Sequence, residues 1–187
     1  MLQLEEARKK ILEKIQPLGS EIIPLSTSFQ RVLAEEIMAL VDLPPFDNSA
    51  MDGYAVQSQD LILARADSPI GLQLIGRIAA GEFISSPLKT GTCVRIFTGS
   101  PLPPGADAVV MQEEISLDSA HPEKIFFCEN VRPEENIRHR GEDVRKNSIL
   151  LKVGQRMTAG QITLLAAVGI ETVRVRRQPI VGLLATG

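Results

Sequence analysis

Glycine and proline divide the sequence between about residues 41 and 136 into short apolar runs, and this spacing constrains the fold more than any other feature. Four of the runs read LQLIGRIAAGE, TCVRIFTG, DAVVMQEE and KIFFCENV. Apolar runs of about four to eight residues between turn-forming residues are typical of strands, whereas helices need longer periodic segments. We therefore predict a β-rich unit with many tight turns.

Helical patterns flank this unit on the N-terminal side. Leu4, Ala7, Ile11 and Ile15 recur at three- and four-residue spacing with charged residues between them, which predicts an amphipathic helix that ends before Pro17. One face of that helix is expected to pack on another surface. We predict a second helix after the hydroxyl-rich residues 26–28, with an apolar stripe made by Phe29, Val32, Leu33 and Ile37.

A third helix is predicted to begin after Thr158. Thr158 and Gln161 have the spacing of a capping box, Met157 and Ile162 that of a hydrophobic staple, and Gly169 stands where a helix C-terminus favours glycine. The next run, ETVRVRRQ, alternates valine with arginine and predicts a strand with one solvated face. The final run, IVGLLATG, resembles the first strand of an α/β unit, so we expect the sequence to be the N-terminal piece of a longer protein.

Composition excludes several classes of function. The chain has 187 residues, of which 44% are hydrophobic, and its net charge of −3 gives no basic field for nucleic acid or anionic lipid. We expect no nucleic-acid partner and no membrane association, and we expect a cytoplasmic location because the N-terminus carries charges where a signal peptide needs an apolar stretch. Cys93 and Cys128 lie in apolar runs and are interpreted as buried reduced thiols.

Three polar loops are the candidate functional segments. The first lies in LPPFDNSAMDGYAV, where two prolines exclude a helix and Asp47, Asn48, Ser49 and Asp52 precede a short strand. The second is FTGSPLPPGAD, in which Thr98 follows a strand and glycine lets backbone N–H groups approach a ligand. The third, NIRHRGEDVR, places arginines and carboxylates around a glycine.

The chemistry of these loops suits an anionic ligand and its metal. Carboxylates such as Asp52 and Asp143 are ligands for Mg²⁺, and the guanidinium groups of Arg138 and Arg140 suit phosphate or another oxyanion. Structural alternatives remain open at this point: turn aspartates usually cap backbone groups, Thr98 has the sequence of an ordinary turn, and RHRGED has that of a solvated hairpin with surface ion pairs. The sequence contains no GxxxxGK[ST] loop and no GxGxxG after a strand.

Three stretches carry a resemblance to a known family. PPFDNSAMDGYAV, RIFTGSPLPPGADAVVMQEE and IRHRGEDV, in that order, resemble the signature stretches of the molybdopterin molybdenumtransferases, the bacterial MoeA proteins, whose relatives include the plant and gephyrin E domains. The resemblance extends from the first helix to Gly187. It implies an elongated homodimer with four domains per subunit.

The resemblance also implies an α+β fold and its domain limits. Residues 1–44 and 141–178 are expected to form one discontinuous domain of helices and a few strands, with the β-rich domain 45–140 inserted into it. Residues 179–187 are expected to form the first strand of a truncated molybdopterin-binding α/β domain. The acidic DEL that follows in the family is absent, so part of the expected active site lies outside this sequence.

The family reaction inserts molybdate into adenylated molybdopterin, releases AMP and depends on a divalent cation. By motif, Asp52, Thr98 and Asp143 stand where the family has residues needed for activity, with Asp52 and Asp143 as tentative Mg²⁺ ligands. Arg138, Arg140 and Ser49 are the candidates for binding substrate or anion, and Asp47 is interpreted as a capping residue. The expected partners are a second copy of the chain and, transiently, a molybdopterin adenylyltransferase.

Two alternatives stay open beside this interpretation. The chain is expected to be inactive alone, because the surface that binds the adenylated pterin is largely missing. One alternative is a dimerising scaffold of the same fold without catalysis, as the gephyrin branch suggests. The other is that a separate chain supplies the missing domain.

Overall fold

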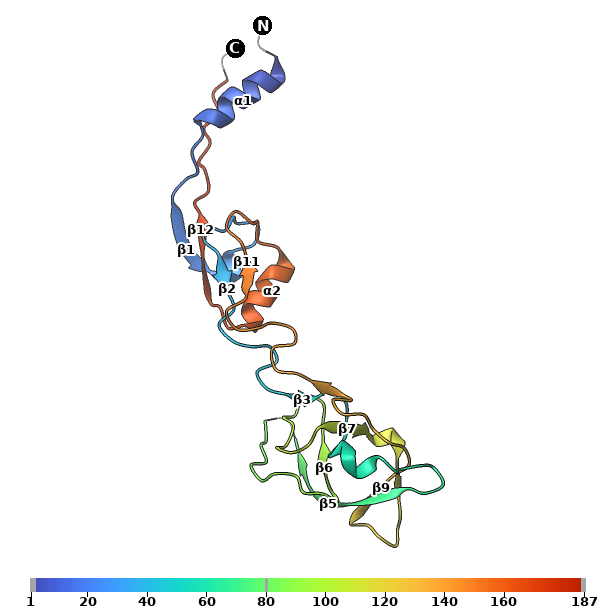
Figure 1. The fold of residues 1–187 in the computed structure, drawn as a ribbon. Helices are drawn as coiled ribbons and strands as arrows, with labels where there is room; N and C mark the ends of the chain where they lie inside the picture. Colours follow the sequence, from blue (N-terminus) through green and yellow to red (C-terminus); the bar gives the residue numbers. More distant parts are fainter. Residues whose placement is uncertain (1–2, 80, 186–187) are drawn as a thin grey trace. The chain divides into compact units, whose positions relative to one another are not determined.

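The computed structural model describes residues 3–79 and 81–185, and they form two compact units. Contacts group residues up to 41 with residues from 146 onward in unit 1, and residues 42–145 in unit 2. Most of the regular elements in the described residues are strands, and two are α-helices (Figure 1). The domain limits expected at residues 44/45 and 140/141, and the elongated shape, stay predictions.

Unit 1 contains both α-helices and two small antiparallel sheets. Its elements are α1 (Leu4–Lys14), β1 (Ser20–Pro24), the 3₁₀ helix η1 (Leu25–Thr27), β2 (Ile37–Met38), β11 (Ile149–Leu151), α2 (Ala159–Ala167) and β12 (Thr172–Arg176). Strand β1 pairs with β12, and β2 pairs with β11. The predicted strand 171–178 is thereby confirmed, with Val173 and Val175 buried and the alternating Arg174 and Arg176 partly exposed.

Helix α2 begins at the predicted capping box. The Thr158 hydroxyl accepts the Gln161 N–H at 3.4 Å, and the Gln161 side-chain oxygen accepts the Thr158 N–H at 2.9 Å. Gly169 ends the helix with a φ of 79°, a conformation that costs glycine little. Leu165 is the buried residue of the helix, and it joins Met157, Val173 and Val175 in the core of unit 1.

The helix predicted after residues 26–28 is wrong. The chain forms only η1 there, and Gln30 then adopts a φ of 64°, which ends any regular helix. The N–H groups of Leu33 and Ala34 donate to Gln155 O and Arg174 O, both at 2.9 Å. The apolar residues read as a helical stripe therefore belong to an extended segment whose hydrogen bonds reach distant parts of unit 1.

Unit 2 is the predicted β-rich unit. Its elements are β3 (Asn48–Ser49), β4 (Gly53–Val56), η2 (Ser58–Leu61), β5 (Ile70–Ile78), β6 (Thr92–Ile96), β7 (Ala108–Met111), η3 (Gln112–Glu114), β8 (Ile115–Leu117), β9 (Lys124–Phe127) and β10 (Ile137–Arg138). Five of its strands, β4, β5, β6, β7 and β9, fall in predicted runs, whereas the short strands β3, β8 and β10 were not predicted. Six of these strands form one sheet in the order β7-β4-β6-β5-β9-β8, in which only β5 and β6 run parallel.

Strand β4 lies inside this sheet and is buried on both faces. Tyr54 and Val56 point to a cluster that contains Phe127, whereas Ala55 packs with Ile96 and Val109 on the other face. The second cluster is covered by Leu102, Ala106 and Ile137, which come from the second and third polar loops or their immediate neighbours. The loops are therefore anchored by packing as well as by hydrogen bonds.

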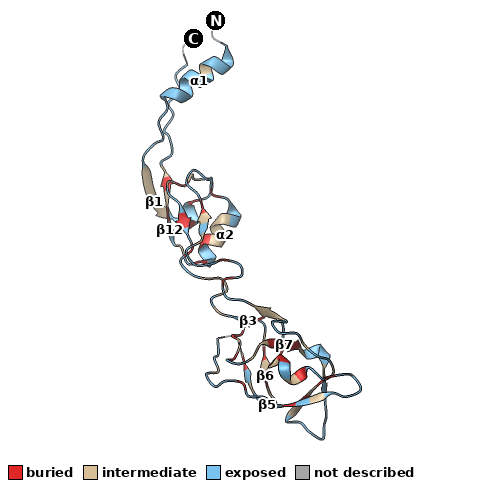
Figure 2. Cartoon of the chain, viewed as in Figure 1, coloured by how far each residue is buried: buried red, intermediate tan, exposed pale blue. Residues whose placement is uncertain are grey.

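Helix α1 confirms the first predicted helix but has no buried residue among those described (Figure 2). Of its predicted apolar face, Leu4, Ile11 and Ile15 are more than half exposed, and Ala7 is partly buried. The apolar run from Ile180 to Leu184 is also exposed and is not a strand in the described residues; its role as the first strand of a further domain stays a prediction.

Two further expectations concern the thiols and the membrane. Both cysteines are free; Cys93 is fully buried, as predicted, and burial raises the pKa of its thiol to about 12, whereas Cys128 is partly exposed. Across residues 3–79 and 81–185, no helix has both the length and the apolar character needed to cross a membrane.

Candidate functional site

The three polar loops meet at strand β3. Ser49 lies opposite Ile137 of the third loop in the β3–β10 pair. It also donates its N–H to Ser100 O at 3.0 Å, and its carbonyl accepts the N–H of Gly99 at 2.8 Å, both in the second loop. The first loop is thus hydrogen-bonded along its backbone to the other two, and the segments singled out in the sequence form one surface of unit 2.

Asp52 and Thr98 are in direct contact at this surface. Both the backbone N–H and the hydroxyl of Thr98 donate to Oδ1 of Asp52, each at 2.8 Å. These two hydrogen bonds, the backbone one first, hold the pKa of the Asp52 carboxyl below its usual range, and the charge of Arg95 lowers it further. Among the residues described, none donates to Oδ2, so one oxygen of this exposed carboxylate stays available to a ligand.

Strand pairing explains why these two residues meet. Asp52 precedes β4, Thr98 follows β6, and Gln112 follows β7; β4 runs antiparallel to the other two strands, so all three residues lie at one edge of the sheet. The Gln112 N–H donates to Asp52 O at 3.1 Å. Gly53 allows this approach, because a Cβ at that position would lie 2.0 Å from Val110 O.

The third loop is held by ion pairs and backbone caps. Arg138 Nη2 lies 2.6 Å from Asp143 Oδ2, and this hydrogen bond raises the pKa of the Arg138 guanidinium. Arg140 Nε lies 2.7 Å from Oδ2 of Asp42, a mostly buried carboxylate. Gly141 makes the turn with a φ of 71°. Both arginines thus have carboxylate partners, and a substrate anion would have to compete with them or bind at their remaining N–H groups.

The first loop uses its other polar residues to satisfy its own backbone. Asp47 Oδ1 accepts the Arg140 N–H at 2.7 Å, which is the capping role predicted for it. The Asn48 side chain donates to Phe46 O, and the hydroxyl of the fully buried Ser49 donates to Met51 O. Anion binding by Ser49 stays a prediction, and it would require this hydroxyl to exchange its partner.

Sequence reasoning missed four residues of this surface: Arg95, Gln112, Ser100 and Asp42. Arg95 is the charged residue of β6, a strand that is mostly buried, and this charge is the signal in the sequence that points to it. Ser100 is fully buried, and its hydroxyl has no hydrogen-bond partner among the described residues. Nothing in the sequence pairs Asp42 with Arg140, which lies 98 positions away.

The loops of unit 2 offer few side chains that could bind a metal ion. Within residues 3–79 and 81–185, no group of three or more His, Cys, Asp or Glu side chains is placed to hold an ion. Mg²⁺ often uses one or two carboxylates and completes its shell with water and substrate oxygens. Oδ2 of Asp52 fits that use, whereas Asp143 fits it less well because one of its oxygens is bound to Arg138.

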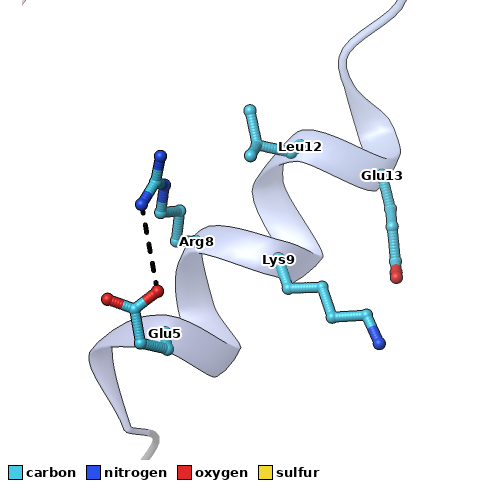
Figure 3. Close-up of a pocket in the computed structure, with 5 residues that line it drawn as sticks. All are labelled: Glu5, Arg8, Lys9, Leu12 and Glu13. Carbon is cyan, nitrogen blue, oxygen red and sulfur yellow. Dashed lines mark ion pairs between the residues drawn. The ribbon is translucent and has the colours of Figure 1, made fainter.

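A hollow along α1 is the other surface feature that invites attention. Figure 3 shows that all five lining residues, Glu5, Arg8, Lys9, Leu12 and Glu13, come from the helix itself. Its ion pair, Arg8 with Glu5, is long at 3.9 Å and solvent-exposed. A hollow with one wall does not enclose a ligand, so the loops of unit 2 remain the candidate site.

Comparison with known proteins decides the family. The profile of the MoeA N-terminal region (domain I and II) matches residues 2–169. The chain belongs to the MoeA family. The resemblance drawn from the three signature stretches is thereby confirmed.

MoeA relatives match along the whole chain. The chain is 40% identical to the molybdopterin molybdenumtransferase of Haemophilus influenzae and 38% identical to that of Bacillus subtilis, in both cases over 100% of its own length. It covers 45% and 44% of those proteins, and so spans less than half the length of the curated relatives it matches. A crystal structure of the molybdopterin biosynthesis MoeA protein of Pyrococcus horikoshii superposes with a TM-score of 0.89 at 36% identity, over 96% of this chain and 47% of that one.

Proposed function

We propose that this chain is the N-terminal part of a molybdopterin molybdenumtransferase, which acts in molybdenum cofactor biosynthesis. The reaction inserts molybdate into the dithiolene of adenylated molybdopterin and releases AMP. Family membership and the names of the relatives support this activity. The single structural observation that supports it is the Asp52–Thr98 pair, in which a carboxylate oxygen is fixed by two donors at an exposed surface.

The proposed role of Asp52 follows from its electrostatics. A carboxylate whose pKa is lowered is a weak base at neutral pH, so it serves better to orient water or bind a cation than to remove a proton. Release of AMP requires water to attack a phosphorus atom of the phosphoanhydride bond while the bridging oxygen leaves on the other phosphate, and the proton of the water passes to that phosphate or to solvent. Asp52 orients that water through Oδ2, and Thr98 keeps the carboxylate in place through Oδ1.

Mg²⁺, when bound, would neutralise charge on the phosphate oxygens of the substrate. Asp52 is the first residue proposed to hold it, and Asp143 the second. Arg138 and Arg140 would contact molybdate or phosphate through the N–H groups that their carboxylate partners leave unoccupied.

The wider organisation is proposed from the family. We propose an α+β, elongated, cytoplasmic homodimer, in which residues 45–140 form a domain inserted between 1–44 and 141–178 and residue 179 begins the pterin-binding domain. A transient contact with a molybdopterin adenylyltransferase would deliver the substrate.

The test replaces Asp52 and Asp143 separately by asparagine in the full-length protein. Asparagine keeps the shape and removes the charge, so we expect cofactor formation to fall by about 10²-fold or more. The melting temperature should change little, because both side chains are exposed and the asparagine oxygen can still accept the hydrogen bonds that each aspartate accepts. Molybdenum insertion is measured at saturating adenylated molybdopterin and varied Mg²⁺.

Asp118→Asn is the matched control, since Asp118 also accepts a backbone N–H in an exposed turn. It should keep full activity. If Asp52→Asn and Asp143→Asn keep activity within a few-fold of the parent across the Mg²⁺ range, both aspartates have only a structural role in their turns and the site assignment is wrong. The 187-residue chain is assayed alongside and is expected to be inactive; a full-length protein without insertion activity would favour the scaffold function instead.

A further inference from the structure

Arg95 occupies an unusual position beside the candidate site. Its guanidinium carbon lies 5.0 Å from the ring centroid of Tyr54 and 5.0 Å from that of Phe97, so the side chain packs against two aromatic rings. Cation–π contacts of this kind stabilise a guanidinium group most where water is partly excluded, and Arg95 is partly buried. The side chain is therefore held in one conformation.

Arg95 forms hydrogen bonds with two residues that are attached to Asp52, one through the chain and one through a backbone hydrogen bond. Nη1 donates to Gly53 O at 3.1 Å, and Nη2 donates to the side-chain oxygen of Gln112. Gly53 follows Asp52 in the chain, and Gln112 is the residue whose N–H donates to Asp52 O. The planar guanidinium thus ties together two residues that fix the Asp52 backbone.

We propose that Arg95 is a positioning residue for Asp52 in the reaction proposed above, on which this inference rests. Thr98 fixes the carboxylate of Asp52, and Arg95 fixes the peptide that carries it. Two N–H groups of Arg95 are engaged with Gly53 and Gln112, and its faces lie against Tyr54 and Phe97. Arg95 therefore acts through Asp52, and not by touching the substrate.

A purely structural role makes a different prediction. If Arg95 only strengthened the edge of the sheet, its loss would reduce activity in proportion to the unfolded fraction, and the effect would be the same whether or not residue 52 carries a charge. A residue that acts through Asp52 loses its effect once Asp52 is replaced, because mutations within one functional unit are not additive.

The experiment is a double-mutant cycle in the full-length protein, with Arg95→Gln, Asp52→Asn and the combined variant. We expect Arg95→Gln to lower kcat about 10-fold or more, with the KM for adenylated molybdopterin within about twofold of the parent. In the Asp52→Asn background the same change should alter kcat by less than about twofold. Arg95→Lys keeps the charge but not the planar fork, so its kcat should fall between those of the parent and Arg95→Gln.

Arg77→Gln is the matched control. Arg77 lies directly opposite Arg95 in the β5–β6 pair, is exposed, and makes no side-chain hydrogen bond or ion pair with the described residues. It should keep kcat within about twofold of the parent, since surface substitutions of this kind have small effects. A second readout is the amide proton of Thr98, which donates to Asp52 Oδ1 and should shift to higher field in Arg95→Gln but not in Arg77→Gln.

Five results would overturn the assignment. Arg95→Gln with parental kcat, or with the same loss in both backgrounds, would contradict it while leaving the proposed function intact. If Asp52→Asn is too slow for the cycle to be measured, an unshifted Thr98 amide in Arg95→Gln decides against it and a shifted one supports it. A parent without insertion activity, or an Asp52→Asn variant with full activity, removes the proposed function itself and this inference with it.

Discussion

The Asp52 side chain caps donors of a neighbouring loop and also keeps one carboxylate oxygen open to a ligand. One oxygen accepts both donors of Thr98, as a capping residue does, whereas the group as a whole is fully exposed. The contacts of Asp52 therefore fit both a structural role and a role in the site. Oδ1 serves the structural role because it accepts the Thr98 donors, whereas Oδ2 is open to a ligand. The two roles are distinguished by measuring what the carboxylate of Asp52 does, and not by its position in a turn.

Thr98→Val is expected to raise the pKa of Asp52 part of the way toward the ordinary value of 3.8, because valine removes the hydroxyl donor and keeps the backbone N–H. Thr98→Ser retains both donors and should leave the pKa unchanged. The measurement is a titration of the Asp52 carboxyl carbon by NMR. An identical pKa in the valine variant would contradict the hydrogen bond from the Thr98 hydroxyl.

The same shift fixes the sign of the pH dependence. A carboxyl whose pKa is lowered in the folded state stabilises that state above its unfolded pKa, and this contribution is lost as the pH falls through the folded pKa. The difference in unfolding free energy between the parent and Thr98→Val should therefore be present at pH 6 and shrink below about pH 4. A difference that grows on acidification would reverse the assignment.

The candidate site was partly predictable at this scale. Asp52, Thr98 and the third loop are recognisable because polar residues cluster where the backbone has to turn. Arg95 and Gln112 were not, since their role depends on β6 and β7 lying on either side of β4, and one sequence does not reveal strand order. Site residues that lie close together in the sequence could be predicted, whereas those brought together by strand pairing could not.

At the scale of elements, a helix or strand was predicted correctly where its backbone hydrogen bonds are determined by nearby residues. Strands β4, β5, β6, β7 and β9 and helix α2 were predicted correctly because turn residues and caps are encoded beside them, whereas the short strands β3, β8 and β10 were missed. The segment 29–37 has apolar residues at helical spacing but satisfies its N–H groups through distant partners such as Gln155 O. The β-branched Val32 and Ile37 favour that extended conformation, so tertiary pairing overrode the apparent period.

Helix α2 offers the element-scale prediction. Thr158→Ala removes the side-chain acceptor for the Gln161 N–H and should lower the free energy of unfolding of unit 1 by about 1 kcal/mol. Thr163→Ala is the control in the same helix: its hydroxyl only bonds back to Ala159 O, and alanine is the better helix former, so stability should stay equal or rise slightly. Urea unfolding followed by circular dichroism at 222 nm measures both. Equal losses in the two variants would mean that the capping box contributes nothing.

At the scale of the whole molecule, each unit has its own apolar core. Leu165, Met157 and Val175 are fully buried in unit 1, while Phe127 and Leu72 are buried in unit 2. Since burial of apolar surface is the main stabilising contribution, each unit has the means to fold as a cooperative block.

The last prediction tests this independence with one large-to-small substitution in each core. Leu165→Ala and Leu72→Ala each remove a buried side chain and should cost about 2–5 kcal/mol, but in different units. The single tyrosine of the chain, Tyr54, reports on unit 2 by fluorescence, and both α-helices lie in unit 1, so ellipticity at 222 nm reports mainly on unit 1. We expect Leu165→Ala to shift the urea transition seen at 222 nm and leave the tyrosine transition in place, and Leu72→Ala to do the reverse. If both probes shift together in either variant, the two units unfold as one, and a substitution at the core of unit 1 would then be felt at the Asp52–Thr98 pair.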